Sequence, residues 1–272
     1  MTRTSSETSK KTSAPKPSTL RIGKRYRATR VAERYDAIVI GSGIGGMTTA
    51  ALMSKAGKKV LVLEQHYTAG GYTHSYSRNG YEWDVGVHYI GEVGDPSSSM
   101  RRVFDFITDG QLKWAKMDDN YDRLYFGDEV YNLTAGRKAF QAELIKDFPE
   151  EKKAIKKYLT VLDSVSRFIP LKIMDKLLPS QLGSTYNFFK KYGLPDYFNQ
   201  ATYDVLSSLT QNQKLIAVLT GQYGDCGLPP KQSSFLIHAL IARHYLSGAY
   251  YPEGGAWKIA DTIIPVIQQS GG

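Results

Sequence analysis

Three glycines of this 272-residue chain have a spacing that suits the binding of a dinucleotide. Gly41, Gly43 and Gly46 form the pattern G-x-G-x-x-G. The first glycine permits a tight turn from a strand into a helix, the second lets a pyrophosphate approach the backbone, and the third lets the helix pack closely on the sheet. Phosphates then meet the free N–H groups at the helix N-terminus. The other residues of this predicted phosphate loop are Ser42, Ile44 and Gly45.

The elements around the loop support this interpretation. Residues 35–40 are an apolar, β-branched run typical of a buried parallel strand. Residues 47–56 have a helical composition, and a second apolar strand at 59–63 ends on Glu64. This acid follows Gly41 by 23 positions, close to the interval of about 20 expected for a carboxylate that accepts a hydrogen bond from a ribose hydroxyl. We therefore expect an α/β fold with a Rossmann-like βαβ unit and a parallel sheet.

The residues after this acid indicate which dinucleotide is bound. Glu64 is followed by Gln65 and, further along, by the pair Gly70-Gly71. The pattern E-x-x-x-x-x-G-G resembles flavoproteins of the glutathione-reductase and amine-oxidase type, and a carboxylate at this position repels the 2′-phosphate of NADP. The chain has no second glycine pattern of this kind. FAD is the expected cofactor, and NAD(P)H is left open as an electron donor without a Rossmann site of its own in this chain.

Four further strings resemble the all-trans-retinol 13,14-reductase (retinol saturase) branch of the phytoene desaturase and carotenoid isomerase superfamily. They are GGYTHSY at 70–76, GYEWDVGVHYIG at 80–91, LTGQYGD at 219–225 and YPEGG at 251–255. The resemblance extends over residues 35–272, and the string HYIG within the second block is the most discriminating part.

This resemblance implies an FAD-dependent oxidoreductase that acts on CH–CH bonds of a hydrophobic, long conjugated polyene such as a retinol or a carotenoid. In such enzymes the flavin carries out the hydride chemistry. Gly86 would let the backbone approach the flavin, and His88 is the candidate proton donor for the reacting carbon. The alternative for His88 is a core histidine that donates to a backbone carbonyl, and Tyr89 is a weaker catalytic candidate. No metal site is expected.

Other functions stay open at this point. Within the same class, the chain could be a carotenoid cis–trans isomerase or a phytoene desaturase. In a different class, it could be a non-catalytic fragment or a lipid-binding protein, since Rab GDP-dissociation inhibitors share this architecture and carry prenyl chains. The intact glycine pattern and Glu64 favour the flavoenzyme, because a protein released from cofactor binding has no physical need for them.

The basic residues are concentrated in the first part of the chain. Residues 1–34 contain ten Lys or Arg and two Glu, whereas the remainder contains 25 basic and 24 acidic residues. Nucleic-acid binding is therefore not expected of the folded part. Residues 1–34 are interpreted as a disordered tail, either a solubilising extension, a transit-like leader or a contact for anionic lipid.

The predicted domains follow from these patterns. Residues 35–95 form the FAD-binding unit, 96–250 a mostly helical substrate domain with a hairpin near 121–133, and 251–272 a segment that returns toward the FAD unit. Residues 168–178 mix apolar residues with lysines, which suits either a core helix or a helix in the membrane interface. Helices are expected over 139–147, 155–169, 196–208, 211–221, 231–246 and 255–269.

The strand content is low for such a fold. A doubly wound domain has about five or six parallel strands, so we expect an incomplete sheet. The chain would then be a truncated product or an N-terminal fragment, which a second polypeptide could complete. No apolar segment lies near the start of the sequence, and no apolar run is long enough to span a membrane, so neither a signal peptide nor a transmembrane helix is expected. A cytoplasmic or peripherally membrane-associated protein is expected.

Overall fold

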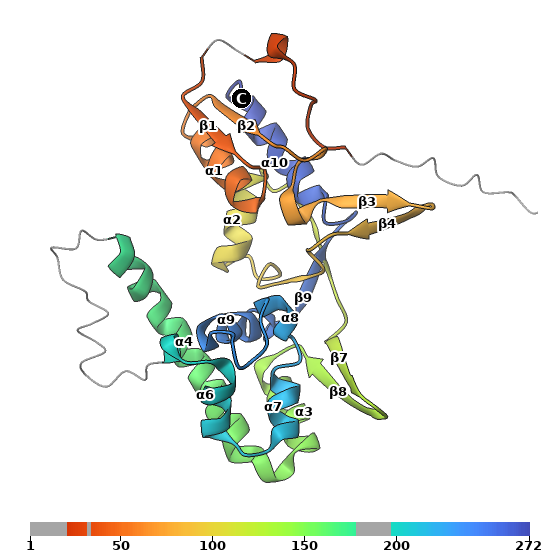
Figure 1. Cartoon of the computed structure of the whole chain (residues 1–272), viewed down its shortest axis with the longest axis vertical. Helices are drawn as coiled ribbons and strands as arrows, with labels where there is room; N and C mark the ends of the chain where they lie inside the picture. The colour runs from red at the N-terminus through yellow and green to blue at the C-terminus, as the bar shows by residue number, and fades with distance from the viewer. Residues whose placement is uncertain (1–20, 32–33, 178–196) are drawn as a thin grey trace, which may run out of the picture. The chain divides into compact units, whose positions relative to one another are not determined.

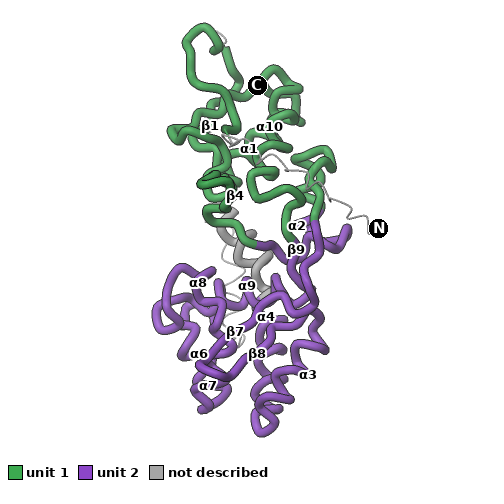
Figure 2. Tube along the Cα trace, turned by 90° about the vertical axis from the view of Figure 1, so that its right-hand side faces the viewer, with its two compact units in different colours: residues 1–88, 102–114, 251–272 green, residues 89–101, 115–250 purple. Residues whose placement is uncertain are grey.

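The computed structural model describes residues 21–31, 34–177 and 197–272. The chain divides into two compact units (Figure 2), each described below by itself. Unit 1 consists of residues 1–88, 102–114 and 251–272, and unit 2 consists of residues 89–101 and 115–250. Three elements contain residues of both units, because the chain passes between the units within them: α2 (Ser99–Ile107), β6 (Trp114–Lys116) and β9 (Ala249–Pro252).

Unit 1 contains the expected βαβ motif (Figure 1). Strand β1 (Ala37–Ile40) leads through the glycine loop into α1 (Ile44–Lys55), and β2 (Val60–Leu63) follows. The two strands are parallel over their whole length, from the pair Ala37–Val60 to the pair Ile40–Leu63. The Rossmann-like, parallel arrangement predicted from the sequence is confirmed.

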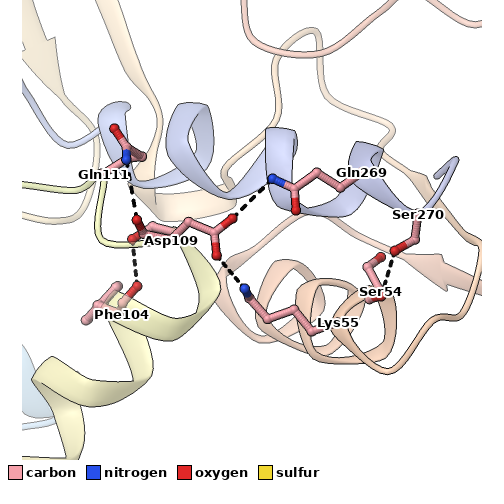
Figure 3. Close-up of polar contacts among 8 residues, drawn as sticks. Ser54, Lys55, Phe104, Asp109, Gln111, Gln269 and Ser270 are labelled. Atoms are coloured by element: carbon pink, nitrogen blue, oxygen red, sulfur yellow. Dashed lines mark hydrogen bonds and ion pairs between the residues drawn. The ribbon is translucent and has the colours of Figure 1, made fainter.

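Helix α10 (Lys258–Gln269) packs against α1 in unit 1. The Ser270 hydroxyl donates to the Ser54 carbonyl at 2.6 Å. Lys55 forms an ion pair with Asp109, whose other carboxylate oxygen accepts from the Gln269 amide at 3.1 Å (Figure 3). These contacts join three segments that are distant in the sequence. The apolar side of α10 is buried through Ile259, Ala260, Ile263, Val266 and Ile267.

Within the described residues the parallel sheet has two strands, the small sheet expected from the sequence. Ile38 is 60% exposed and Ile40 is 87% exposed, so apolar side chains of β1 are uncovered in this structure. A separate antiparallel hairpin consists of β3 (Ser75–Arg78) and β4 (Tyr81–Asp84). Its turn residues Asn79 and Gly80 both have positive φ, 54° and 81°, as a type I′ turn requires.

Residues 21–31 lie within the segment that the sequence analysis interpreted as a disordered tail, yet the structure gives them defined contacts in unit 1. They include the short 3-10 helix η1 (Ala28–Arg30). The Ile22 amide donates to the Thr68 hydroxyl at 2.9 Å, and the Ala69 amide donates to the Ile22 carbonyl at 3.0 Å. Basic composition did not reveal these backbone contacts because they depend on a distant loop. Residues 1–20 lie outside the described part.

Unit 2 is mostly helical. Its hairpin is formed by β7 (Asn120–Phe126) and β8 (Glu129–Thr134). A short strand, β5 (Ile90–Gly91), pairs with β9. The remaining elements of the chain are η2 (Gly71–Thr73), α3 (Arg137–Asp147), η3 (Pro149–Glu151), α4 (Lys152–Leu177), η5 (Tyr197–Asn199), α6 (Thr202–Leu209), α7 (Gln213–Leu219), α8 (Tyr223–Cys226) and α9 (Phe235–Tyr245).

The core of unit 2 lies between the hairpin and the helices. Tyr158, Leu159, Leu162, Val205 and Phe235 are almost completely buried in it. The side chains of residues 168–178 lie outside the described part, so the membrane-interface alternative for that segment stays a prediction. Among the helices that the structure describes, none combines the length and apolar character needed to cross a bilayer.

Candidate functional site

The glycine loop of unit 1 presents an open backbone surface. A Cβ atom added to Gly41, Gly43 or Gly45 would meet nothing within 4 Å. The loop is therefore not filled by side chains of the described residues. It leads directly into α1, whose first amide groups have no acceptor within the helix. Together these features form a site for an anion.

Two glycines of the loop are required for different reasons. Gly41 has φ of +97°, a conformation that L-residues rarely adopt, and its amide donates to the Leu63 carbonyl at 2.7 Å. A Cβ on Gly46 would lie only 2.1 Å from the Gly41 carbonyl oxygen and 3.3 Å from Val39. Close packing of α1 on β1 therefore requires glycine at position 46, as the spacing predicted.

The Glu64 carboxylate lies against the loop and is fully ionised near neutral pH. One oxygen accepts from the Ser42 amide at 2.8 Å and from the Ser42 hydroxyl at 2.5 Å. The other oxygen accepts from the His66 amide at 2.8 Å. The Ser42 hydroxyl, followed by these amides, lowers the pKa of Glu64 from 4.5 to about 2. The charge that would exclude a 2′-phosphate is therefore present.

The glycine pair packs directly on the phosphate loop. Gly70 and Gly71 have φ of +121° and +55°, and the Gly70 amide donates to the Ser42 hydroxyl oxygen at 3.0 Å. A Cβ on Gly71 would lie 2.8 Å from the Cα of Gly43. The structure thus brings together the glycine loop, Glu64 and the glycine pair, which the sequence assigned to one site.

The other predicted site residues have different surroundings. Gln65 is exposed. Gly86 packs on Tyr72, since a Cβ at this position would lie 2.9 Å from the Tyr72 Cβ. His88 is exposed and is the last residue of its segment of unit 1.

Tyr89 is half-buried in unit 2. Its hydroxyl donates to Asp122 at 3.0 Å and accepts from the Gln222 amide at 3.2 Å. Burial, followed by the Asp122 charge, raises the pKa of Tyr89. The Tyr89 phenol therefore stays protonated at neutral pH. The hydrogen bonds given above join its hydroxyl to two other side chains of unit 2.

A carboxylate that the sequence analysis did not single out connects two parts of unit 1. Asp84 accepts from the Ser75 hydroxyl, from the Tyr251 hydroxyl and, at 3.2 Å, from the Ala256 amide. It thereby joins the hairpin to the segment that follows β9. Both Asp84 and Tyr251 lie in the sequence strings that resemble the reductase branch. The spacing of these two residues along the chain gives no indication that they are in contact.

A cavity of about 330 Å³ lies beside this site within unit 1. Ser42, Met47, Glu64 and His66 line it, together with much of the basic segment 21–31. Among the described residues there is no group of three His, Cys, Asp or Glu side chains that could hold a metal ion. The polar groups suit a dinucleotide: helix amides that donate to phosphate and a carboxylate that accepts from a ribose hydroxyl.

Comparisons with known proteins agree with this geometry. Residues 39–107 match the family model described as "NAD(P)-binding Rossmann-like domain". The all-trans-retinol 13,14-reductase of Danio rerio is 42% identical over 258 residues, which is 91% of this chain. The chain is a homologue of the all-trans-retinol 13,14-reductases. It spans 42% of the length of that relative.

Two other relatives show the range of this homology. A Danio rerio protein named "Inactive all-trans-retinol 13,14-reductase" is 36% identical over 92% of this chain. The chain covers 42% of the length of that protein. A prolycopene isomerase of an Oncidium hybrid cultivar is 26% identical over 85% of the chain and is covered over 40% of its own length. The likeness to the carotenoid isomerase superfamily predicted from the sequence is thus confirmed.

Solved structures show the same fold at low identity. An oxidoreductase of Methanosarcina mazei has a TM-score of 0.57 at 18% identity, covering 87% of this chain and 50% of its own. A Rab GDI of Plasmodium falciparum has a TM-score of 0.50 at 14% identity, covering 88% of this chain and 57% of its own. These likenesses concern the fold alone.

Proposed function

We propose that this retinol-reductase homologue forms the ADP-binding part of an FAD-dependent oxidoreductase that acts on a C=C bond of a long conjugated polyene. One observation carries the cofactor assignment. The glycine loop is open at the N-terminus of α1, and an ionised carboxylate stands at the end of the adjacent strand. Phosphate and ribose of one dinucleotide match these two features.

Two features favour FAD over NADP. The negative charge of Glu64 repels a 2′-phosphate, and its low pKa keeps that charge present at neutral pH. The glycine pair packed on Gly43 belongs to the pattern that resembles flavoproteins. Binding of NAD(P)H as an electron donor would need a site apart from this one.

The substrate class is inferred from the relatives. The names of the relatives refer to retinol and to prolycopene, both of which are conjugated polyenes. FAD, when bound, supplies the hydride chemistry that saturation or desaturation of such a bond requires. His88 is the candidate proton donor of this chain, and its exposure leaves it accessible to a substrate.

The cofactor proposal is tested by adding a side chain to the open loop. Gly43 has φ of −63°, and nothing lies within 4 Å of its Cβ position, so Gly43→Ala is compatible with the fold, whereas its methyl group would occupy the space of the pyrophosphate. We expect loss of FAD binding, measured by flavin fluorescence quenching with the full 272-residue chain. Gly224→Ala is the matched control, because its Cβ position in unit 2 is also open. Equal FAD affinity in both variants would contradict the proposal.

A non-catalytic role is the second candidate, because one homologue at 36% identity is named inactive. The two roles are distinguished with the FAD-loaded chain, supplied with retinol or lycopene under reducing and oxidising conditions. Product analysis should reveal a saturated, desaturated or isomerised polyene if the chain is an enzyme. Binding of FAD and polyene without any change in either polyene would favour a non-catalytic role for this chain on its own.

A further inference from the structure

Ser42 connects the three parts of the candidate site through one hydroxyl group. This hydroxyl donates to Glu64 at 2.5 Å and accepts from the Gly70 amide at 3.0 Å. The Ser42 amide donates to the same Glu64 oxygen at 2.8 Å. The loop after β1, the end of β2 and the glycine pair therefore meet at one residue.

Although Ser42 borders the cavity, it is almost fully buried and has no donor group left for a ligand. Its exposed fraction is 1%, and both its amide proton and its hydroxyl proton are donated to Glu64. It retains no free donor for a phosphate. Any effect of this serine on the binding of a dinucleotide must act through its hydrogen-bond partners, the Glu64 carboxylate and the Gly70 amide.

The Glu64 carboxylate has little capacity left for a ligand. An ionised carboxylate has roughly four acceptor positions. Ser42 and His66 donate three hydrogen bonds to it, and the Gln65 amide also acts on it. Ser42 supplies two of these bonds, and its hydroxyl makes the shortest of them, at 2.5 Å. The direction in which the carboxylate faces a ribose hydroxyl therefore depends mainly on the serine.

On this basis, and resting on the proposed function, we infer that Ser42 is a positioning residue: it orients Glu64 so that the carboxylate selects a dinucleotide by one ribose hydroxyl. The low pKa of Glu64, caused first by the Ser42 hydroxyl, is consistent with a carboxylate held ready as an acceptor. Loss of the hydroxyl removes the shortest bond to Glu64 and leaves the amide bonds of residues 42 and 66. The carboxylate should then lose its fixed direction while the loop keeps its backbone course.

The experiment measures selectivity by titration calorimetry. ADP, 2′-deoxy-ADP and 3′-deoxy-ADP are the probes, used with the full chain. The wild-type chain should bind ADP about tenfold more tightly than one of the two deoxy analogues, as expected for a hydrogen bond to a charged group. In Ser42→Ala, the affinity for ADP should fall about tenfold and this ratio should approach one.

A merely structural role gives a different result. If Ser42 only stabilises the loop, Ser42→Ala weakens ADP and both analogues equally, the ratio is unchanged and the inference is overturned. An unaltered affinity for ADP overturns it as well. In the Glu64→Gln background, Ser42→Ala should have no further effect on the ratio, because the selecting carboxylate is already absent.

Controls separate this inference from the proposed function. Ser54 is another serine of unit 1, 2% exposed, whose hydroxyl donates to the Ile267 carbonyl away from the loop. Ser54→Ala should keep the affinity for ADP within about twofold of the wild type. If the wild-type chain binds neither ADP nor FAD, the proposed function itself fails. If the wild type selects ADP and Ser42→Ala selects it equally well, only the inference about Ser42 fails.

Discussion

A Cβ atom on Gly71 would lie 2.8 Å from the Cα atom of Gly43, although the two residues are 28 positions apart. The glycine pair is thus packed backbone to backbone on the phosphate loop. The two glycines differ in their surroundings: Gly71 has no room for a side chain, whereas Gly43 faces open space, where we propose that the pyrophosphate lies.

The first prediction concerns Gly71→Ala. It combines a positive φ with a steric overlap, so we expect a loss of about 2–4 kcal/mol in the free energy of unfolding, measured by urea denaturation. Gly80→Ala is the matched control, since Gly80 also has positive φ but an open Cβ position. It should lose only about 1–2 kcal/mol. Equal losses would show that the packing on Gly43 does not matter.

The second prediction compares two adjacent glycines at the start of α1. Gly46→Ala places a methyl group 2.1 Å from the Gly41 carbonyl oxygen and should destabilise unit 1 by about 3 kcal/mol or more. Gly45→Ala meets nothing within 4 Å and should be neutral or stabilising by up to about 1 kcal/mol, because alanine favours the helix. Thermal unfolding followed by circular dichroism ranks the two variants. The reverse order would be inconsistent with the structure.

The third prediction is a pH dependence. The folded-state pKa of Glu64, about 2, lies below the ordinary value of 4.5. Its ionised form therefore stabilises the fold fully above about pH 4.5, and this contribution is lost as the pH falls toward about 2. Partial exposure of the carboxylate screens the effect. Glu64→Gln should flatten the decline in stability across this window.

A suitable control for that pH series is Glu150→Gln, which removes a carboxylate at an exposed position. Chemical denaturation at closely spaced pH values gives the slope for each variant. If Glu64→Gln and the wild type decline in parallel between pH 4.5 and 2, Glu64 is not held as the structure describes.

The fourth prediction concerns Asp84, which accepts from Ser75, Tyr251 and Ala256. Asp84→Ala should cost about 2–4 kcal/mol, since it leaves three donors without their acceptor. Limited proteolysis should then cut the segment after β9 faster than in the wild type. Asp84→Asn retains one acceptor oxygen and should show a smaller effect. Unchanged cleavage in Asp84→Ala would contradict the proposed link.

Local sequence determined the βαβ motif and the identity of its loop. The turn from β1 into α1 depends on residues that are neighbours in the chain, so Gly41, Gly43 and Gly46 could be assigned roles from their spacing alone. The hairpin of unit 2 and most helices followed from apolar periodicity and turn residues for the same reason. The hairpin turn at Asn79-Gly80 carried an equally local signal that the sequence analysis did not use.

Only the tertiary structure decided how distant segments meet. The bond from Gly70 to Ser42 spans 28 positions, and that from Tyr251 to Asp84 spans 167. The contacts of Ile22 with Thr68 and Ala69 are of this kind too. Short-range patterns cannot reveal such contacts, because a serine, an aspartate or a backbone amide can find a hydrogen-bond partner in many places, and the folded chain determines which one is near.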